Sequence, residues 1–236
     1  MARLTIVALE TIPEVNPGDD LAALLVEAAL REEVDLAGAD CLVVTQKIVS
    51  KAEGRLVRLD PADPLAHRRL IESESTRILR RRDDLLLCET PHGFVCANAG
   101  VDLSNVDPGW AALLPLDSDR SARRIRARLA ARFEIQLAVV VTDTFGRPWR
   151  QGVTDVAIGV AGLAPVADLR GGTDDRGQVL RSTVVAVADE VAAAADLVMG
   201  KSRRAPAAVC YGLDPAWLAE GSIGEVLRRS ADDLFR

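Results

Sequence analysis

The sequence predicts a mixed α/β fold in which mixed sheets are flanked by helices. Three observations support this fold class. Short apolar runs of strand length, at residues 41–44 and 137–141, end in polar side chains. Segments with helical periodicity and a capping residue lie between such runs, as at residues 21–31 and 118–133. No G-x-G-x-x-G follows the first strand, and Gly200-Lys201-Ser202 follows a helix where a P-loop would precede one, so we expect neither a Rossmann nor a P-loop fold.

The first half of the chain predicts short strands separated by helices. Residues 3–9 are expected to form the first strand. Pro17-Gly-Asp-Asp20 is a helix-start signal in which Asp19 or Asp20 can cap a helix at residues 21–31. The runs that follow predict, in order, a buried strand at 41–44, an edge strand at 56–59, a helix at 64–82 and a strand at 85–88.

The second half predicts a long helix followed by the central strand. The helix at 118–133 has Asp117 or Ser118 as its cap, and the strand at 137–141 is expected to stop at Thr142. Glycine-interrupted apolar residues at 152–162 are typical of a strand close to other backbone. The remaining expectations are a long loop at 168–178, a helix at 183–199, a strand at 207–211 and a closing helix at 215–235.

Composition limits the classes of function. The chain has 236 residues, of which 49% are hydrophobic, and a formal net charge of −6, which argues against a general nucleic-acid binder. No apolar run reaches the ~18 residues of a membrane span and the N-terminus lacks a signal-peptide pattern, so a cytoplasmic protein without a membrane partner is expected. Arginine-rich segments at 68–82 and 120–132 are interpreted as solvated helix faces, with an anionic-ligand surface as the alternative. The four cysteines are expected to be buried free thiols.

Lysine is rare in this chain. Of 29 basic residues, only Lys47, Lys51 and Lys201 are lysine. Lysines that remain among so many arginines are candidates for sites that need a compact ammonium, such as phosphate contacts. Lys47 and Lys51 are four residues apart and would share a helix face, where they repel each other unless an anion lies between them. A phosphate site is the favoured interpretation, and a solvated turn is the alternative.

Acidic and hydroxyl side chains gather at two predicted strand ends. Asp143 and Thr144 end the central strand, and Asp102, Ser104 and Asn105 lie within four residues of one another. Oxygen ligands at such spacing can bind a hard divalent cation, and they can equally form an Asx turn.

The helix predicted at 183–199 carries two further carboxylates. Glu190 lies beside its apolar stripe and is a functional candidate, whereas Asp189 points away from the stripe and is expected to be solvated.

Several mechanisms can be set aside. The only histidines are His67 and His92, and no G-x-S-x-G is present, so a Ser-His-Asp hydrolase is not expected. Carboxylates, hydroxyls, an amide and lysines at strand ends remain. These groups suit a divalent cation and phosphate, and hence phosphoryl transfer or nucleotide-driven ligation.

Several motifs together carry a family resemblance. They are, in chain order, Gln46-Lys-Ile-Val-Ser-Lys51-Ala-Glu-Gly54, Ala99-Gly-Val-Asp102-Leu-Ser-Asn105-Val106, Val141-Thr-Asp143-Thr144-Phe-Gly-Arg-Pro-Trp-Arg150, Ala188-Asp-Glu190 and Met199-Gly200-Lys201. The chain resembles the coenzyme F420-0:L-glutamate ligase family, the gamma-glutamyl ligases of deazaflavin biosynthesis. The resemblance extends from Ile12 to about Gly212.

The resemblance implies a family-specific ligase fold and a ligase activity. Residues 1–236 would form one gamma-glutamyl ligase unit, or two intertwined subdomains, without the flavin-reductase-like C-terminal domain of some relatives. The enzyme would use GTP and Mg²⁺ or Mn²⁺, with K⁺ a further candidate ion. It would couple the amine of L-glutamate to the terminal carboxylate of F420-0 through an acyl phosphate, releasing GDP and phosphate. The same reaction could add further gamma-linked glutamates. A homodimer is expected.

The resemblance also assigns residues. Asp102 and Asp143 would hold one metal ion, Thr144 would help to hold a second, and Lys51 would act with the two aspartates in catalysis. The nucleotide would contact Ile12, Pro13, Glu14, Val15, Gln46, Lys51, Asn105, Met199, Gly200, Lys201, Ser202, Arg203, Arg204, Ala205 and Pro206. Two positions depart from the family pattern: Gln46, where Ser also occurs, and Lys201, where a neutral Gln assists the second metal. An ammonium cannot ligate a cation, so Lys201 either binds phosphate or leaves the second metal weakly held.

Two alternatives belong to other classes. Val-Val-Thr-Asp143-Thr-Phe145 is similar to the nucleophile motif of haloacid-dehalogenase phosphohydrolases, but that class needs a second aspartate where Phe145 stands. A non-enzymatic nucleotide-binding protein is the other alternative. Arg147, Arg150 and the region of Arg124 are unassigned candidates for binding glutamate or a substrate phosphate.

Overall fold

A five-stranded mixed sheet forms the centre of the molecule. The computed structural model describes residues 3–233. In spatial order the sheet comprises β1 (Thr5–Leu9), β12 (Ala207–Tyr211), β2 (Cys41–Thr45), β8 (Ala138–Arg147) and β9 (Arg150–Ala161). Only β2 and β8 pair in parallel; the other neighbours are antiparallel. The mixed α/β class predicted from the sequence is confirmed.

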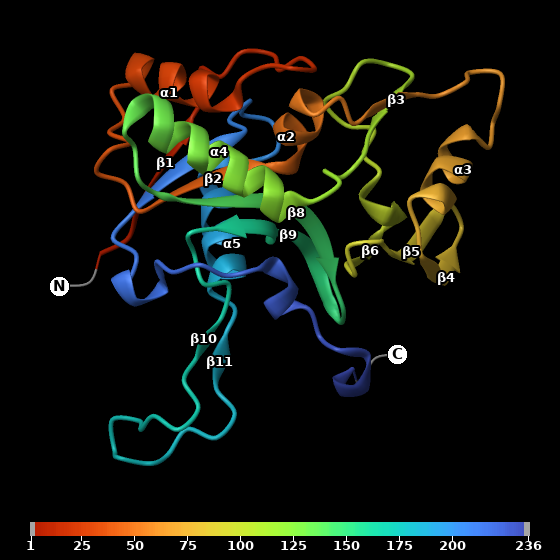
Figure 1. Cartoon of the computed structure of the whole chain (residues 1–236). Coiled ribbons are helices and arrows are strands. Elements are labelled where there is room, and N and C mark those ends of the chain that lie inside the picture. Colours follow the sequence, from red (N-terminus) through yellow and green to blue (C-terminus); the bar gives the residue numbers. More distant parts are fainter. Residues whose placement is uncertain (1–2, 234–236) are drawn as a thin grey trace.

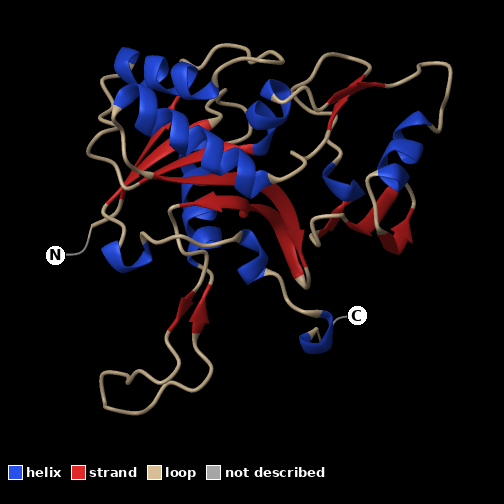
Figure 2. Ribbon diagram, in the orientation of Figure 1, coloured by secondary structure: helices blue, strands red, loops and turns tan. Residues whose placement is uncertain are grey.

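Helices cover both faces of this sheet (Figure 2). The long helix α4 (Ser118–Phe133), with α1 (Leu21–Arg31) beside it, lies over one face, and α5 (Val187–Met199) lies under the other. Both predicted caps are present: Asp20 accepts from Ala23 N, and Asp117 accepts from Arg120 N at 2.8 Å. Glycine allows α4 to approach the sheet closely, because a Cβ built on Gly159 would lie 2.4 Å from the backbone of Ser118.

A smaller lobe lies beside the central sheet (Figure 1). It is built around a second hydrophobic cluster, which includes Ile71, Leu86 and Leu113. Its elements are β3 (Leu56–Arg58) paired with β7 (Trp110–Ala112), the three-stranded sheet of β4 (Arg77–Arg82), β5 (Leu85–Glu89) and β6 (Val95–Ala97), and the helix α3 (Ala66–Ser73). The helix α2 (Gln46–Ala52), which follows β2, connects the sheet to this lobe.

A two-stranded arm projects away from the central sheet (Figure 1). It consists of β10 (Ala167–Asp168) and β11 (Val184–Val185), joined by residues 169–183, where a long loop was predicted. Because β11 takes up the start of the predicted helix, α5 begins at Val187 and not at residue 183. Among the described residues, no helix is long and apolar enough to cross a membrane.

The predicted helix at 64–82 is wrong in its second half. The helix α3 ends at Ser73, and the hydroxyl of Ser75 donates to Ile71 O at 2.6 Å, which satisfies a carbonyl of its last turn. Arg77–Arg82 is the strand β4, which pairs antiparallel with β5. Helical spacing of Ile78 with Ile71 suggested otherwise, but β4 forms a hairpin with β5 through the turn at Asp83 and Asp84, where Asp83 has φ +52°.

The predicted closing helix at 215–235 is also wrong. This segment forms three separate 3₁₀ turns, η2 (Pro215–Trp217), η3 (Ile223–Val226) and η4 (Ser230–Asp232). Gly221 and Gly224 interrupt it, and Ser222 forms a capping box that starts η3 afresh. Phe235, the predicted end of the helix, lies outside the described residues. The four cysteines are all buried and free, as predicted.

Candidate functional site

The strand directions bring several chain segments to one edge of the central sheet. Leu9, Ala207, Val44 and Val141 occupy neighbouring positions on β1, β12, β2 and β8. The segments that follow β1, β2 and the apolar part of β8 therefore meet the segment that precedes β12. Thr45 N donates to Pro206 O at 2.9 Å, which joins two of these segments directly. Such an edge, at the carboxyl ends of strands, is where α/β sheets commonly bind ligands.

The sequence predicted that the central strand stops at Thr142, and this prediction is wrong. β8 continues through Arg147 because its polar half forms a hairpin with β9, and the register shifts by one residue between Val141 and Thr142. Asp143 and Thr144 thus lie on a paired strand, not in a loop. Thr144 lies opposite Asp155 of β9.

Asp155 is a site residue that the sequence reasoning missed. Its side chain is only 2% exposed, and it accepts hydrogen bonds from the hydroxyls of Thr142 at 3.0 Å and Thr144 at 2.6 Å. The sequence did carry one signal for this residue: Asp155 is a lone aspartate among the alternating apolar residues of a strand. A buried carboxylate requires such partners, since an unpaired charge in the interior is costly.

Asp102 is held beside Lys47. It forms an isolated bridge with Ala112 of β7, and its carboxylate accepts from Ser104 N at 2.7 Å and pairs with Lys47 Nζ at 2.6 Å. Lys47 also donates to Ser104 O at 2.6 Å and to the Ser104 hydroxyl at 2.8 Å. Burial by itself would raise the pKa of Asp102, but hydrogen bonds from Lys47 and Ser104 outweigh it and lower the pKa below 3.8.

Asp143 is electrostatically coupled to the other site carboxylates. Its pKa is raised from 3.8 to about 7, chiefly by burial; the negative charges of Asp102 and Asp155 act in the same direction, and a hydrogen bond from the Thr144 backbone opposes them. Lys201 acts in the lowering direction. The fold therefore brings together Asp102 and Asp143, which are 41 residues apart in the sequence.

The third lysine of the chain reaches the same cluster from another segment. Lys201 follows α5, whose C-cap Gly200 has φ +60°. Its Nζ donates to the Thr144 hydroxyl, pairs with Asp155 Oδ1 at 3.1 Å, and lies 3.8 Å from Asp196 Oδ1. The side chain is otherwise accessible, with 59% of its surface exposed.

Lys51 lies on α2 and is itself largely buried, at 8% exposure. Its ammonium pairs with Glu14 of the segment after β1. Lys47 and Lys51 do share a short helix, as predicted, but each pairs with a separate carboxylate. All three lysines of the chain therefore form ion pairs at this edge of the sheet.

The segment after β1 contains the predicted nucleotide contacts Ile12, Pro13, Glu14 and Val15, and a single carboxylate holds its start. Glu32 Oε1, at the C-cap of α1, accepts from Glu10 N at 2.8 Å, Thr11 N at 2.7 Å and the Thr11 hydroxyl at 2.7 Å. Val15 is buried and the other three are at least partly accessible. The backbone of this segment is thus fixed at the sheet edge.

The other predicted nucleotide contacts differ in accessibility. Gln46 is only 2% exposed; its Oε1 accepts from the Ser50 hydroxyl, while its Nε2 has no hydrogen-bond partner among the described residues. Asn105 is exposed, with φ +52°. In the segment 199–206, the side chains of Met199 and Ala205 belong to the buried interior. Gly200 and Pro206 are partly exposed, and Lys201, Ser202, Arg203 and Arg204 are exposed.

The burial expected for Asp189 and Glu190 is reversed in the structure, while the functional role of Glu190 stays a prediction. Glu190 is exposed, whereas Asp189 is half-buried and accepts from Ala157 N of β9 at 3.0 Å. Burial raises the pKa of Asp189, and the Ala157 hydrogen bond opposes that rise. The helix wheel failed here because the facing strand β9 defines which side of α5 is covered.

The side chains at the sheet edge fit a divalent cation whose remaining ligands come from water and a bound phosphate. Within residues 3–233, no group of three or more His, Cys, Asp or Glu side chains is arranged to hold a metal ion unaided. Mg²⁺ sites in phosphoryl-transfer enzymes commonly use one or two carboxylates, with water and substrate phosphates completing the shell. Asp102 and Asp143, coupled through their charges and flanked by a hydroxyl, match that pattern.

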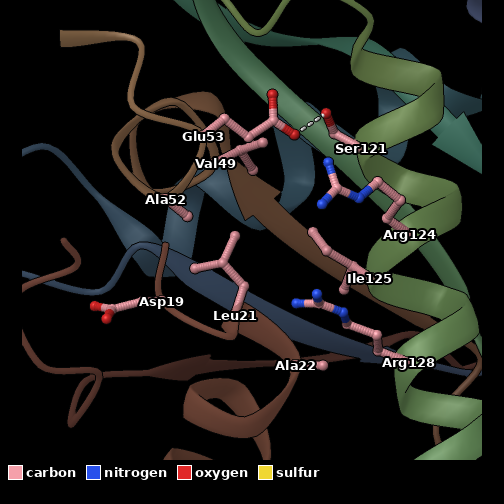
Figure 3. A pocket seen from close by; sticks show the side chains of 10 residues that line it. All are labelled: Asp19, Leu21, Ala22, Val49, Ala52, Glu53, Ser121, Arg124, Ile125 and Arg128. Atoms are coloured by element: carbon pink, nitrogen blue, oxygen red, sulfur yellow. Dashed lines mark hydrogen bonds between the residues drawn. The ribbon is translucent and has the colours of Figure 1, made fainter. Parts of the chain in front are cut away.

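A separate hollow of about 50 Å³ lies between α1, α2 and α4 (Figure 3). Arg124 and Arg128 of α4 border it, with Glu53 at one side, where the Ser121 hydroxyl donates to Glu53 Oε1 at 2.6 Å. It includes none of the predicted metal or nucleotide residues. Arg124 therefore lines a different surface from Asp102, Asp143 and Asp155, and no role is assigned to it.

Comparison with known proteins gives matches along nearly the whole chain. Residues 10–212 match the family described as F420-0:Gamma-glutamyl ligase. The coenzyme F420:L-glutamate ligase of Methanothermobacter thermautotrophicus is 42% identical over 249 residues, covering 99% of this chain and 99% of that protein. The proteins of the same name from Methanopyrus kandleri and Archaeoglobus fulgidus are 40% and 36% identical, covering 100% and 99% of this chain and 100% and 97% of their own lengths.

Proposed function

This chain belongs to the F420-0:gamma-glutamyl ligase family, and we propose that it joins L-glutamate through its amine to the terminal carboxylate of coenzyme F420-0. The single observation that best supports this activity is the meeting of Asp102, Asp143 and three lysines at one sheet edge. Carboxylates for a cation and ammonium groups for phosphate are what a nucleotide-driven ligase needs. Addition of further gamma-linked glutamates would repeat the same chemistry.

The proposed reaction has two steps that use GTP. An oxygen of the F420-0 carboxylate attacks the γ-phosphorus of GTP, the bond from that phosphorus to the β–γ bridging oxygen breaks, and GDP leaves. The resulting acyl phosphate is then attacked by the glutamate amine. The carbon–oxygen bond to phosphate breaks, the amide forms, and phosphate leaves while the amine loses a proton to solvent.

Asp102 and Asp143 would hold a divalent ion, Mg²⁺ or Mn²⁺, for which Lys47 would give up its pair with Asp102 and keep its hydrogen bonds to Ser104. Thr144 is a candidate ligand for a second ion. A bound divalent ion supplies positive charge that stabilises the transferring phosphoryl group. The protein's own contribution is to hold both carboxylates at the end of the nucleotide-binding edge. K⁺ is a further candidate ion, and a homodimer is the proposed assembly.

Lys51 would provide the charge that binds the phosphates. Its ammonium is nearly buried, so its attraction for a phosphate is little screened by water. Glu14 now pairs with it, and Glu14 is mostly exposed, so a phosphate can take its place at modest cost. Residues 12–15 and 199–206 would enclose the rest of the nucleotide, largely through backbone groups.

Incubation of the purified chain with GTP, Mn²⁺, L-glutamate and F420-0 tests this proposal. The ligase should give a product heavier by one glutamyl unit, with one GDP formed for each amide. A phosphohydrolase would release phosphate without any need for glutamate. A nucleotide-binding protein would make no product, and either of these results would reject the proposal.

A further inference from the structure

Lys201 places its ammonium among oxygen atoms from three different elements. The Thr144 hydroxyl comes from β8, Asp155 Oδ1 from β9 at 3.1 Å, and Asp196 Oδ1 from α5 at 3.8 Å. An ammonium has three N–H donors and no acceptor, so it can donate to the Thr144 hydroxyl and to Asp155, while Asp196 adds a charge within ion-pair distance. We call the oxygens of Thr144, Asp155 and Asp196 the Asp155 corner.

The Asp155 corner attracts a cation because negative charge is concentrated there. The Asp155 carboxylate is 2% exposed, and the hydroxyls that donate to it carry no charge with which to neutralise it. Asp196 adds a second carboxylate in the last turn of α5, where the helix dipole is also negative. Lys201 is the one basic side chain that pairs with Asp155 within the described part of the chain.

The corner would also suit a free metal ion if the lysine were absent. Carboxylate and hydroxyl oxygens are the ligands that Mg²⁺ and Mn²⁺ prefer. A divalent ion bound to the same oxygens would lie within a few ångströms of the ammonium, where the two like charges repel and compete for the same lone pairs. The ammonium and a divalent ion therefore exclude each other.

We propose that the Lys201 ammonium is the resident cation of the Asp155 corner and keeps divalent ions out of it. This inference rests on the proposed function, in which Asp102 and Asp143 hold a divalent ion at the neighbouring position. The chain would then use one free divalent ion there, and the ammonium would take the place of the second ion for which Thr144 is a candidate ligand. Lysine suits this place better than arginine, because its ammonium is compact and resembles an ion.

Counting bound Mn²⁺ tests the inference without measuring activity. Wild-type chain and the Lys201→Met variant, which keeps the length of the side chain and loses its charge, are titrated with Mn²⁺ while free Mn²⁺ is followed by electron paramagnetic resonance. We expect the variant to bind one more ion per chain than the wild type. Equal counts would overturn the inference. Lys201 is largely exposed, so the variant should fold, and Lys201→Ala provides a second test of the same difference.

A double variant locates the extra ion. Adding Asp196→Asn to Lys201→Met removes one oxygen ligand of the corner, and we expect the extra Mn²⁺ to bind at least about tenfold more weakly. If the extra ion binds as tightly as before, it lies elsewhere and the inference fails. A wild-type chain that binds no Mn²⁺ would instead count against the metal part of the proposed function, and the difference between wild type and variant would still decide the role of Lys201.

Discussion

Thr144 lies directly opposite Asp155 across the β8–β9 hairpin, and its hydroxyl donates a hydrogen bond of 2.6 Å to Asp155 Oδ1. The same carboxylate also receives the Thr142 hydroxyl and the Lys201 ammonium. One buried side chain therefore orients three polar groups at the edge of the sheet. Because the described contacts of Asp155 are to Thr142, Thr144 and Lys201, we regard it as a positioning residue.

Asp155→Asn should lower both stability and activity. The amide keeps the shape of the carboxylate but loses the charge that Lys201 neutralises, and it cannot accept from all three donors. We expect the free energy of unfolding in urea to fall by about 1–3 kcal/mol and the ligation rate to fall by about tenfold or more. Asp175→Asn, an exposed change in the arm, is the control and should alter neither quantity.

Asp143→Asn should abolish most ligation and preserve the fold. The change removes the charge that would hold the divalent ion, so we expect the turnover rate to fall by about a hundredfold or more. The matched control is Asp189→Asn, because Asp189 is also half-buried and, among the described residues, accepts only from the backbone of β9. Near-normal turnover by Asp143→Asn, with circular dichroism showing a folded protein, would reject the metal assignment.

Asp143 should also make stability depend on pH in the absence of added metal and nucleotide. Its pKa in the folded chain is about 7, above the ordinary 3.8, so the folded state binds more protons between these values than the unfolded state. Its contribution to stability is therefore complete below about pH 4 and is lost as the pH rises through 7, by at most about 1.4 kcal/mol per pH unit. Urea titrations from pH 4 to 8 should show this decline in wild type and a smaller one in Asp143→Asn.

Glu14→Gln should strengthen GTP binding. Glu14 competes with the nucleotide phosphates for Lys51, and an ion pair with one exposed partner is worth about 0.2–1 kcal/mol. Removing its charge should lower the KM for GTP by up to about fivefold with little change in kcat. Lys51→Met serves as the opposing variant and should raise that KM. Weaker GTP binding by Glu14→Gln would mean that the carboxylate helps to bind the nucleotide.

Glu32→Ala should loosen the proposed nucleotide segment. Three hydrogen bonds from Glu10 and Thr11 converge on one oxygen of Glu32, and without them residues 10–15 must be ordered when GTP binds. We expect the KM for GTP to rise by about tenfold while kcat stays close to wild type. Glu27→Ala is the control, because Glu27 lies on α1, which Glu32 caps, and within residues 3–233 it pairs only with Arg31. Equal effects of both changes would assign Glu32 no special role.

The parts of the fold that could be predicted carry local signals. The helix α1 begins and ends where capping and periodicity indicated, and so does α4. The buried strands β2 and β12 were found from their apolar runs. The family resemblance, confirmed by the comparisons, was also local, since it depends on short motifs in a fixed order. The pairing of Lys47 with Asp102 lay beyond such signals, because the two residues come from different parts of the fold.

The sequence by itself determined the helices α1 and α4, the apolar centres of β2 and β12 and, through the family resemblance, Asp102 and Asp143 as a candidate pair. The helices and strands follow from capping and periodicity, which act within a few residues. Only the tertiary structure decided that Arg77–Arg82 is a strand, that β8 continues past Thr142, and that Asp155 binds Lys201. The two strands depend on hydrogen bonds to their hairpin partners β5 and β9, and the ion pair joins residues 46 positions apart. The energy of such contacts exists only once the fold has brought the segments together.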